Sequence, residues 1–94
     1  MKNLVWSPKF VRKFKRIAKK NVQLRIQIEK ILELLMEDPF DSSLRTHKLK
    51  GDLEGVWSCS IDYDNRILFE FIIDTESGEE EIFLLTLGSH DDVY

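Results

Sequence analysis

The sequence lacks most of the features that would place it among secreted, membrane-spanning or metal-binding proteins. Cys59 is the only cysteine, so no disulfide framework, cysteine-pair metal motif or cysteine nucleophile signature is present. No apolar run approaches the length of a signal-peptide core or a transmembrane segment. Internal repeats, low-complexity segments and flexible linkers are also missing. We therefore expect one domain over residues 1–94 that resides in the reducing cytoplasm and makes no membrane contact.

Sequence motifs for cofactors are absent as well. The chain has no Gly-rich phosphate loop, no His-Glu-x-x-His helix and no serine elbow. The acidic run of Glu79, Glu80 and Glu81 lacks the spacing of a calcium loop. We therefore expect a protein that works without a cofactor or a metal ion.

Basic residues are nearly missing from the second half of the chain. Residues 51–94 contain one Lys/Arg, Arg66, against 12 Asp/Glu, which gives a formal charge of −11. Residues 1–50 contain 13 Lys/Arg against 5 Asp/Glu, a charge of +8, so the net charge of −3 conceals a strong asymmetry. This division indicates one surface for a polyanion and another for a basic partner, or neutralisation within the molecule. A basic helix that is merely solvated explains the first half equally well.

The hydrophobic pattern predicts a strand followed by a helical hairpin. Residues 2–6 form a short strand candidate, and Ser7 and Pro8 supply an N-cap and a first helical position. A second apolar pattern of helical spacing begins after Asn21 and must end before Pro39, because the residue before a proline avoids the helical region. The polar segment Phe40–Leu53 is typical of an exposed loop.

Three further strands are predicted in the rest of the chain. Residues 55–62 alternate between apolar and polar, residues 66–74 are almost continuously apolar, and residues 81–88 follow a polar turn. Their short connections predict an antiparallel meander, which the first strand joins and the helical hairpin covers on one face. The expected fold is therefore α+β, with two layers and the order β-α-α-β-β-β.

Five residues from distant parts of the sequence could meet at one end of this sheet: His47, Asp64, Arg66, His90 and Tyr94. Two imidazoles and an arginine suit phosphodiester cleavage in RNA, where a base activates the 2′-hydroxyl, an acid protonates the leaving oxygen and a cation stabilises the phosphorane. The guanidinium group also fits phosphate oxygens, and the tyrosine could stack on a base.

Each of these residues also has a simpler interpretation. His47 is in a polar loop and could be solvated, and Asp64 is by default a turn residue. Arg66 could be a surface cation or the partner of Asp62, and Tyr94 could only cover an open end of the core. The residue types alone leave these alternatives open.

Three stretches of the sequence resemble the RelE/ParE superfamily of toxins from type II toxin–antitoxin systems. They are "WSPKF" at the first helix, "HKLKGDLEGVWSCSIDYDNRILFEF" across the second and third predicted strands, and "LGSHDDVY" at the end of the sequence. The middle stretch is similar to the YoeB and YafQ branches, and the final glycine, histidine and aromatic pattern is most similar to YafQ.

The resemblance implies a RelE-like fold and a ribosome-dependent mRNA endoribonuclease that uses general acid/base catalysis without metal and leaves 2′,3′-cyclic phosphate ends. It implies His90 as the principal acid/base residue, His47 and Asp64 as active-site partners, Arg66 as the phosphate-binding residue and Tyr94 as the terminal aromatic. It also implies three kinds of partner. A cognate antitoxin would mask the toxin, the ribosome and its mRNA would be the target, and operator DNA would be bound through the antitoxin.

The chain departs from that pattern on the second predicted strand. RelE has lysines where this sequence has Ser58 and Ser60, so their role is vacant or has moved to Lys48 or Lys50. We expect the basic residues around His47, which are Arg45, Lys48 and Lys50, to contact RNA. The departure leaves two alternatives to an active nuclease: a non-enzymatic toxin that binds DNA gyrase, as in the ParE branch, or an inactive relative that only binds an antitoxin.

Overall fold

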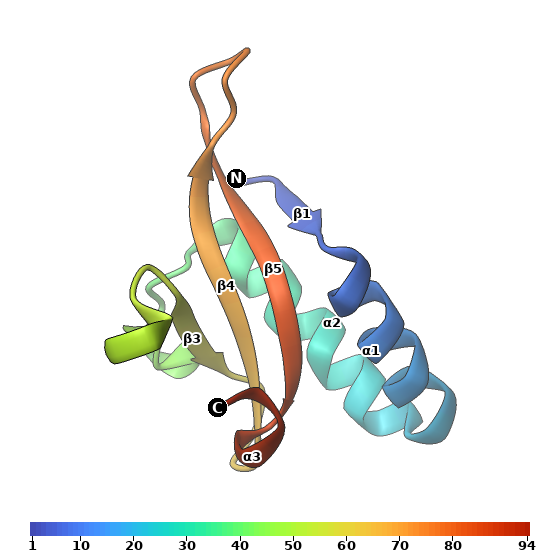
Figure 1. Ribbon diagram of the computed structural model, residues 1–94. Coiled ribbons are helices and arrows are strands. Elements are labelled where there is room, and N and C mark those ends of the chain that lie inside the picture. Colours follow the sequence, from blue (N-terminus) through green and yellow to red (C-terminus); the bar gives the residue numbers. More distant parts are fainter.

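Two helices cover one face of a five-stranded sheet in the computed structural model, which describes residues 1–94 (Figure 1). The predicted two-layer α+β fold is confirmed. In chain order the elements are β1 (Leu4–Trp6), α1 (Pro8–Lys20), α2 (Val22–Glu37), the 3₁₀ turn η1 (Ser42–Leu44), β2 (His47–Lys48), the 3₁₀ turn η2 (Gly51–Leu53), β3 (Trp57–Ser60), β4 (Asn65–Ile73), β5 (Glu80–Ser89) and α3 (His90–Val93).

Capping side chains begin both long helices where the sequence predicted. The Ser7 hydroxyl accepts a hydrogen bond from the amide of Phe10 at 3.1 Å, and Pro8 occupies the first helical position. Asn21 ends α1 and also caps α2, because its side chain accepts a hydrogen bond from the amide of Leu24 at 3.0 Å. One asparagine therefore produces the sharp junction between the two helices. No helix of the structure has the length and apolar content that crossing a membrane requires.

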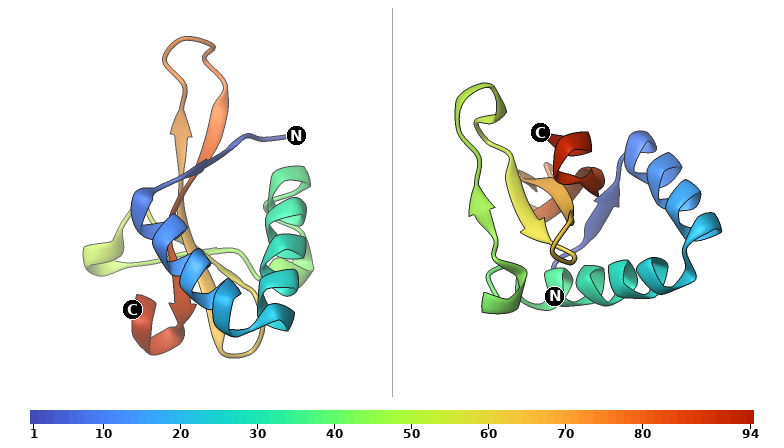
Figure 2. Two further views of the ribbon diagram at one scale, coloured as in Figure 1. Left: turned by 90° about the vertical axis from the view of Figure 1, so that its right-hand side faces the viewer. Right: turned by 90° about the horizontal axis from the view of Figure 1, so that it is seen from below.

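The strands lie in the order β1-β5-β4-β3-β2. The predicted meander of β3, β4 and β5 is confirmed, and β1 joins it by parallel pairing with β5. The hairpin of β4 and β5 extends well beyond the other strands, as the upper part of Figure 1 and the left view of Figure 2 show. The opposite end of this hairpin carries α3 and the C-terminus.

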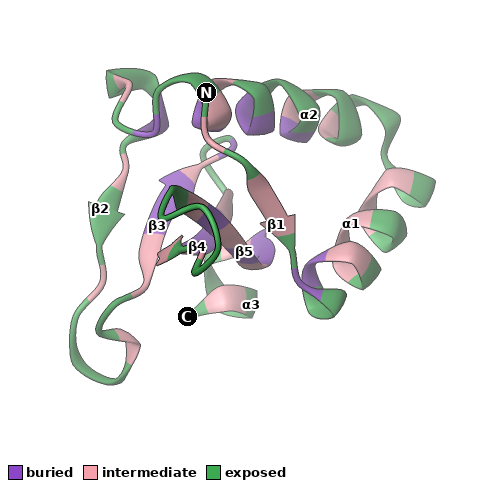
Figure 3. Cartoon of the chain, turned by 90° about the horizontal axis from the view of Figure 1, so that it is seen from above, coloured by how far each residue is buried: buried purple, intermediate pink, exposed green.

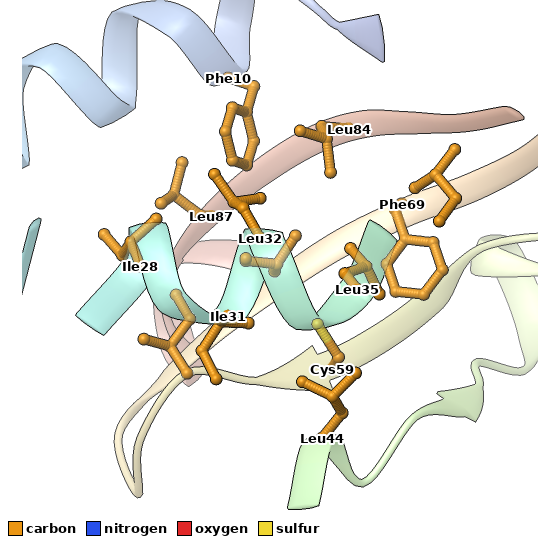
Figure 4. Packing of buried hydrophobic residues seen from close by; sticks show 13 residues of the cluster. Phe10, Ile28, Ile31, Leu32, Leu35, Leu44, Cys59, Phe69, Leu84 and Leu87 are labelled. Atoms are coloured by element: carbon orange, nitrogen blue, oxygen red, sulfur yellow. The ribbon is translucent and has the colours of Figure 1, made fainter. Parts of the chain in front are cut away.

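The hydrophobic core lies between the helices and the sheet (Figure 4). Helix α2 buries one stripe at spacings of three and four residues, as expected for a helix with one apolar face. This stripe consists of Ile28, Ile31, Leu32 and Leu35. Helix α1 adds Phe10, and the sheet contributes side chains from its central strands, including Cys59, Phe69, Leu84 and Leu87.

The prediction that Phe40–Leu53 forms an exposed loop is wrong in part. The segment contains β2 and two 3₁₀ turns, and Leu44 is fully buried beside Cys59 (Figure 4). The Asp41 carboxylate accepts hydrogen bonds from the amide of Ser43 at 2.9 Å and from its hydroxyl at 2.7 Å, which lowers the pKa of Asp41 and forms the first turn. Elements of two or three residues are too short to produce a hydrophobic period, so the pattern did not reveal them.

Helix α3 is a further element that the sequence analysis did not predict. It lies on the face of the sheet opposite α2, as Figure 3 shows, with the sheet between them. The C-terminus is therefore folded onto the sheet instead of extending into solvent.

We predict that Leu44→Ala lowers the free energy of unfolding by about 2–5 kcal/mol, because it leaves a cavity in the core. The control is Ile73→Ala at the exposed end of β4, where the side chain is 60% accessible. It should change stability by about 1 kcal/mol or less. Urea unfolding measures both, and a loss for Leu44→Ala no larger than that of the control would contradict the buried position of this segment.

Candidate active site

The register of the sheet gathers the candidate side chains on the face opposite the two long helices. Residues directly paired across neighbouring strands point to the same face. His47 pairs with Ser58 and Ser58 with Leu68, while Ser60 pairs with Arg66 and Arg66 with Gly88. Two adjacent rows on one face therefore bring His47 of β2 and Arg66 of β4 toward each other.

A glycine allows α3 to fold back over this face. Gly88 has a φ of 152°, a conformation that L side chains rarely adopt, and a Cβ atom there would lie 3.2 Å from Cβ of Asp92. Ser89 then caps the turn by accepting a hydrogen bond from the amide of Asp92 at 3.3 Å. One helical turn places His90 and Tyr94 on the same side, with ring centroids 4.4 Å apart and an interplanar angle of 66°.

Four of the five predicted catalytic residues line one open hollow. This hollow has a volume of about 460 Å³, and its walls are His47, Leu49, Arg66, His90 and Tyr94. Asp64 lies in an adjoining hollow of about 560 Å³ that shares Arg66 and His90 with the first. The structure thus brings the other four residues around Arg66, although the chain separates the first from the last by 47 residues.

Backbone carbonyl groups hold the guanidinium group of Arg66. Its Nη1 atom donates to the carbonyl oxygens of Asp62 at 2.7 Å, Tyr63 at 3.0 Å and Asn65 at 3.1 Å. Arg66 thus bonds to the main-chain carbonyl group of Asp62 and not to its carboxylate. That carboxylate accepts hydrogen bonds from the amides of Asp64 and Asn65. Arg66 therefore keeps its positive charge without an ion pair, and its remaining N–H groups can serve an anion.

The hydrogen bond of His47 identifies the ring nitrogen that is available for proton transfer. Nδ1 lies 2.9 Å from the carbonyl oxygen of Arg45. A carbonyl oxygen can only accept, so Nδ1 carries the proton and Nε2 of the neutral ring has the free lone pair. His90 is less constrained by polar partners, because its Nδ1 lies 3.9 Å from the carboxylate of Asp91 and its side chain is 67% exposed.

The three basic residues near His47 have separate surroundings. Arg45, which has a φ of 52°, lines a third hollow of about 320 Å³ together with Arg66. Lys48 alternates to the other face of β2, and its Nζ lies 5.7 Å from the ring centroid of Trp57. Lys50 lines a hollow with Lys48 that contains none of the five predicted catalytic residues. The structure therefore brings Arg45, but not the two lysines, beside the site.

Sequence reasoning did not find the role of Ser58 in this arrangement. Ser58 is fully buried, and its hydroxyl forms a hydrogen bond with the hydroxyl of Tyr94. The alternation of β3 was the available signal, because it placed Ser58 on the face opposite Cys59. The neighbouring Cys59 takes no part, since burial raises the pKa of its thiol to about 12. No cluster of three or more His, Cys, Asp or Glu side chains that could hold a metal ion is present.

The fold is that of RelE-like toxins of known structure. The structure is similar to the YoeB/ParE toxin from Agrobacterium tumefaciens, with a TM-score of 0.78, 19% identity, and 94% of this chain and 98% of that chain covered. It is also similar to a copper-bound mutant toxin from Helicobacter pylori, with a TM-score of 0.73, 26% identity and full coverage of both chains. YafQ in the E. coli DinJ–YafQ complex gives a TM-score of 0.76 at 14% identity, over 100% of this chain and 99% of that chain.

Residues 2–94 match the family described as "Bacterial toxin of type II toxin-antitoxin system, YafQ", and the chain belongs to this family. The resemblance to the RelE/ParE superfamily noted in the sequence is thereby confirmed. No curated protein matches the chain.

We predict that Gly88→Ala displaces α3 from the sheet, because the added Cβ would approach the Cβ of Asp92 and the backbone conformation disfavours alanine. Amide chemical shifts of residues 89–94 should move in the variant. The control is Gly78→Ala in the distant hairpin, where φ is 74° but no atom lies within 4 Å of the added Cβ. Both variants should lose about 1–3 kcal/mol of stability through backbone strain. Unchanged shifts in residues 89–94 of Gly88→Ala would contradict the fold-back.

Proposed function

We propose that this toxin is a ribosome-dependent mRNA endoribonuclease that cleaves by general acid/base catalysis without a metal ion. The observation that carries the proposal is the hollow lined by His47, Arg66, His90 and Tyr94. Two imidazoles and an unpaired guanidinium group around one space match the requirements of phosphodiester cleavage through the neighbouring 2′-hydroxyl. An arginine and a proton donor would have no such use in a toxin that only binds a protein.

In the proposed reaction, His47 acts as the base through Nε2 and removes the proton of the 2′-hydroxyl, with Asp64 as the alternative base. The 2′-oxygen then bonds to phosphorus, while His90 in its protonated form donates a proton to the departing 5′-oxygen. Arg66 stabilises the negative charge of the phosphorane. The products are a 2′,3′-cyclic phosphate and a free 5′-hydroxyl, and Tyr94 stacks on a base to position the strand.

The basic first half of the chain supports contact with ribosomal and messenger RNA. Helix α1 has no acidic residue, and none of its lysines or arginines takes part in a salt bridge. Seven cations from this helix are therefore available to phosphates: Lys9, Arg12, Lys13, Lys15, Arg16, Lys19 and Lys20. Arg45 adds a cation beside Arg66. Lys48 and Lys50 would meet RNA only outside the hollow.

We further propose a cognate antitoxin that masks the site, through which the complex binds operator DNA in the cytoplasm. Solved relatives include the E. coli DinJ–YafQ complex and the YoeB–YefM complex from Staphylococcus aureus.

We predict that His90→Ala and Arg66→Ala each slow cleavage of ribosome-bound mRNA by about 10²-fold or more, because each removes a group that acts in the transition state. Primer extension on programmed ribosomes with cell-free synthesised protein measures the rate. Arg25→Ala is the matched control, since Arg25 is an exposed cation on α2 that pairs with Glu29. It should cleave like the wild type.

Folding of each variant is checked by its unfolding transition, so that a lost structure is not mistaken for lost chemistry. Full cleavage by a folded His90→Ala variant would remove His90 from the mechanism. If the wild type cleaves no ribosome-bound mRNA, the nuclease proposal fails. A DNA-damage response on induction would then favour a gyrase-binding toxin, and absence of toxicity would favour an inactive antitoxin-binding relative.

A further inference from the structure

Ser58 lies between the two elements that carry the histidines. It pairs with His47 across β2 and β3, and it hydrogen-bonds through its hydroxyl to the hydroxyl of Tyr94 at the C-terminus. Its side chain is completely inaccessible to solvent, so this hydroxyl cannot take water as a substitute partner. The bond therefore ties Tyr94 to β3, the strand next to the β2 edge of the sheet.

Helix α3 is too short to hold itself in place. It has four residues, and isolated helical turns of this length are unstable in water. At its beginning, the amide of His90 donates a hydrogen bond to the carbonyl oxygen of Asp64 at 3.1 Å. At its end, the hydroxyl of Tyr94 is hydrogen-bonded to that of Ser58. Without the second of these, the end of the chain would be free to fray.

The tyrosine ring in turn restricts the imidazole of His90. The two ring centroids lie 4.4 Å apart in an edge-on arrangement, whereas the charged partner of His90 is the fully exposed carboxylate of Asp91, 3.9 Å away. The order of the His90 side chain thus depends on the ring of Tyr94, and the position of that ring depends on the hydrogen bond between its hydroxyl and that of the buried Ser58. Misplacement of a catalytic group by about 1 Å can cost about 10²-fold in rate.

We infer that Ser58 is a positioning residue, which acts through Tyr94 to hold the imidazole of His90 in its working orientation. This inference rests on the proposed function for its catalytic consequence, but its structural content is independent of it.

The test is a double-mutant cycle of Ser58→Ala and Tyr94→Phe, with Ser77→Ala as control. The Ser77 hydroxyl donates to the Asp74 carboxylate and accepts from the amide of Glu79 at the tip of the distant hairpin, so the control loses two hydrogen bonds far from the site. Each site variant should lower the single-turnover cleavage rate by about tenfold while ribosome binding is unchanged. The double variant should be no slower than the slower single variant, because both remove the same bond. Multiplicative effects, or a loss of ribosome binding that accounts for the slower cleavage, would overturn the inference.

Nuclear magnetic resonance of the free protein separates this inference from the nuclease proposal. In the wild type, His90 ring protons should show cross-relaxation with the Tyr94 ring and a ring-current shift, and both should disappear in Ser58→Ala but persist in Ser77→Ala. Persistence in Ser58→Ala would overturn the positioning role. If the wild type cleaves no RNA, the proposed function fails, while these spectra still decide whether Ser58 orders His90.

Discussion

The antiparallel pairing of β4 with β5 is the contact on which the rest of the structure depends. Nine residue pairs join Asn65–Ile73 to the stretch from Glu80 to Ser89, and helices and outer strands attach to this ladder. The register contains one bulge, at which Leu85 has no partner. The carbonyl oxygen of Leu85 accepts a hydrogen bond from the hydroxyl of Ser7. The bulge therefore also fixes the beginning of α1.

The same ladder determines which residues meet at the site. Arg66, near the beginning of β4, pairs with Gly88, near the end of β5, and the chain turns into α3 directly afterwards. The turn that connects β4 to β5 is rich in acidic residues, and it lies at the other end of the ladder. Eight residue steps separate the pair Ile73–Glu80 from Asn65–Ser89, which corresponds to about 26 Å at about 3.3 Å per residue. That distance exceeds the Debye length of about 8 Å in cells, so the tip carboxylates do not oppose binding of phosphate at Arg66.

Long elements were predictable from the sequence, and short ones were not. The cap at Ser7, the break at Asn21, the apolar stripe of α2 and the three strands of the meander each rest on a period or a turn signal, and the structure has them. The strand β2, the turn that buries Leu44 and the single turn of α3 are two to four residues long, and such segments contain no complete period.

The sequence allowed the types of the site residues to be predicted, but not all of the contacts between them. His47, Arg66 and His90 were expected together because their chemistry is complementary, and the strand register does place them around one hollow. The Ser58–Tyr94 bond depends on the fold-back at Gly88, whose positive φ no residue pattern revealed. The opposite orientation of Lys48 follows from the pairing of β2 with β3, and a strand of two residues has no hydrophobic period that would predict this pairing.

The chemistry of the RNA ends tests the central claim most directly. Messenger RNA cut on ribosomes by this protein in the presence of a metal chelator that leaves the ribosomes intact would be examined by mass spectrometry of the fragments. The account predicts a 2′,3′-cyclic phosphate on the upstream fragment and a 5′-hydroxyl on the downstream fragment, because in the proposed reaction the 2′-oxygen is the nucleophile and His90 protonates the leaving oxygen. A 3′-hydroxyl with a 5′-phosphate would contradict it, since those ends require attack by water and not by the neighbouring hydroxyl.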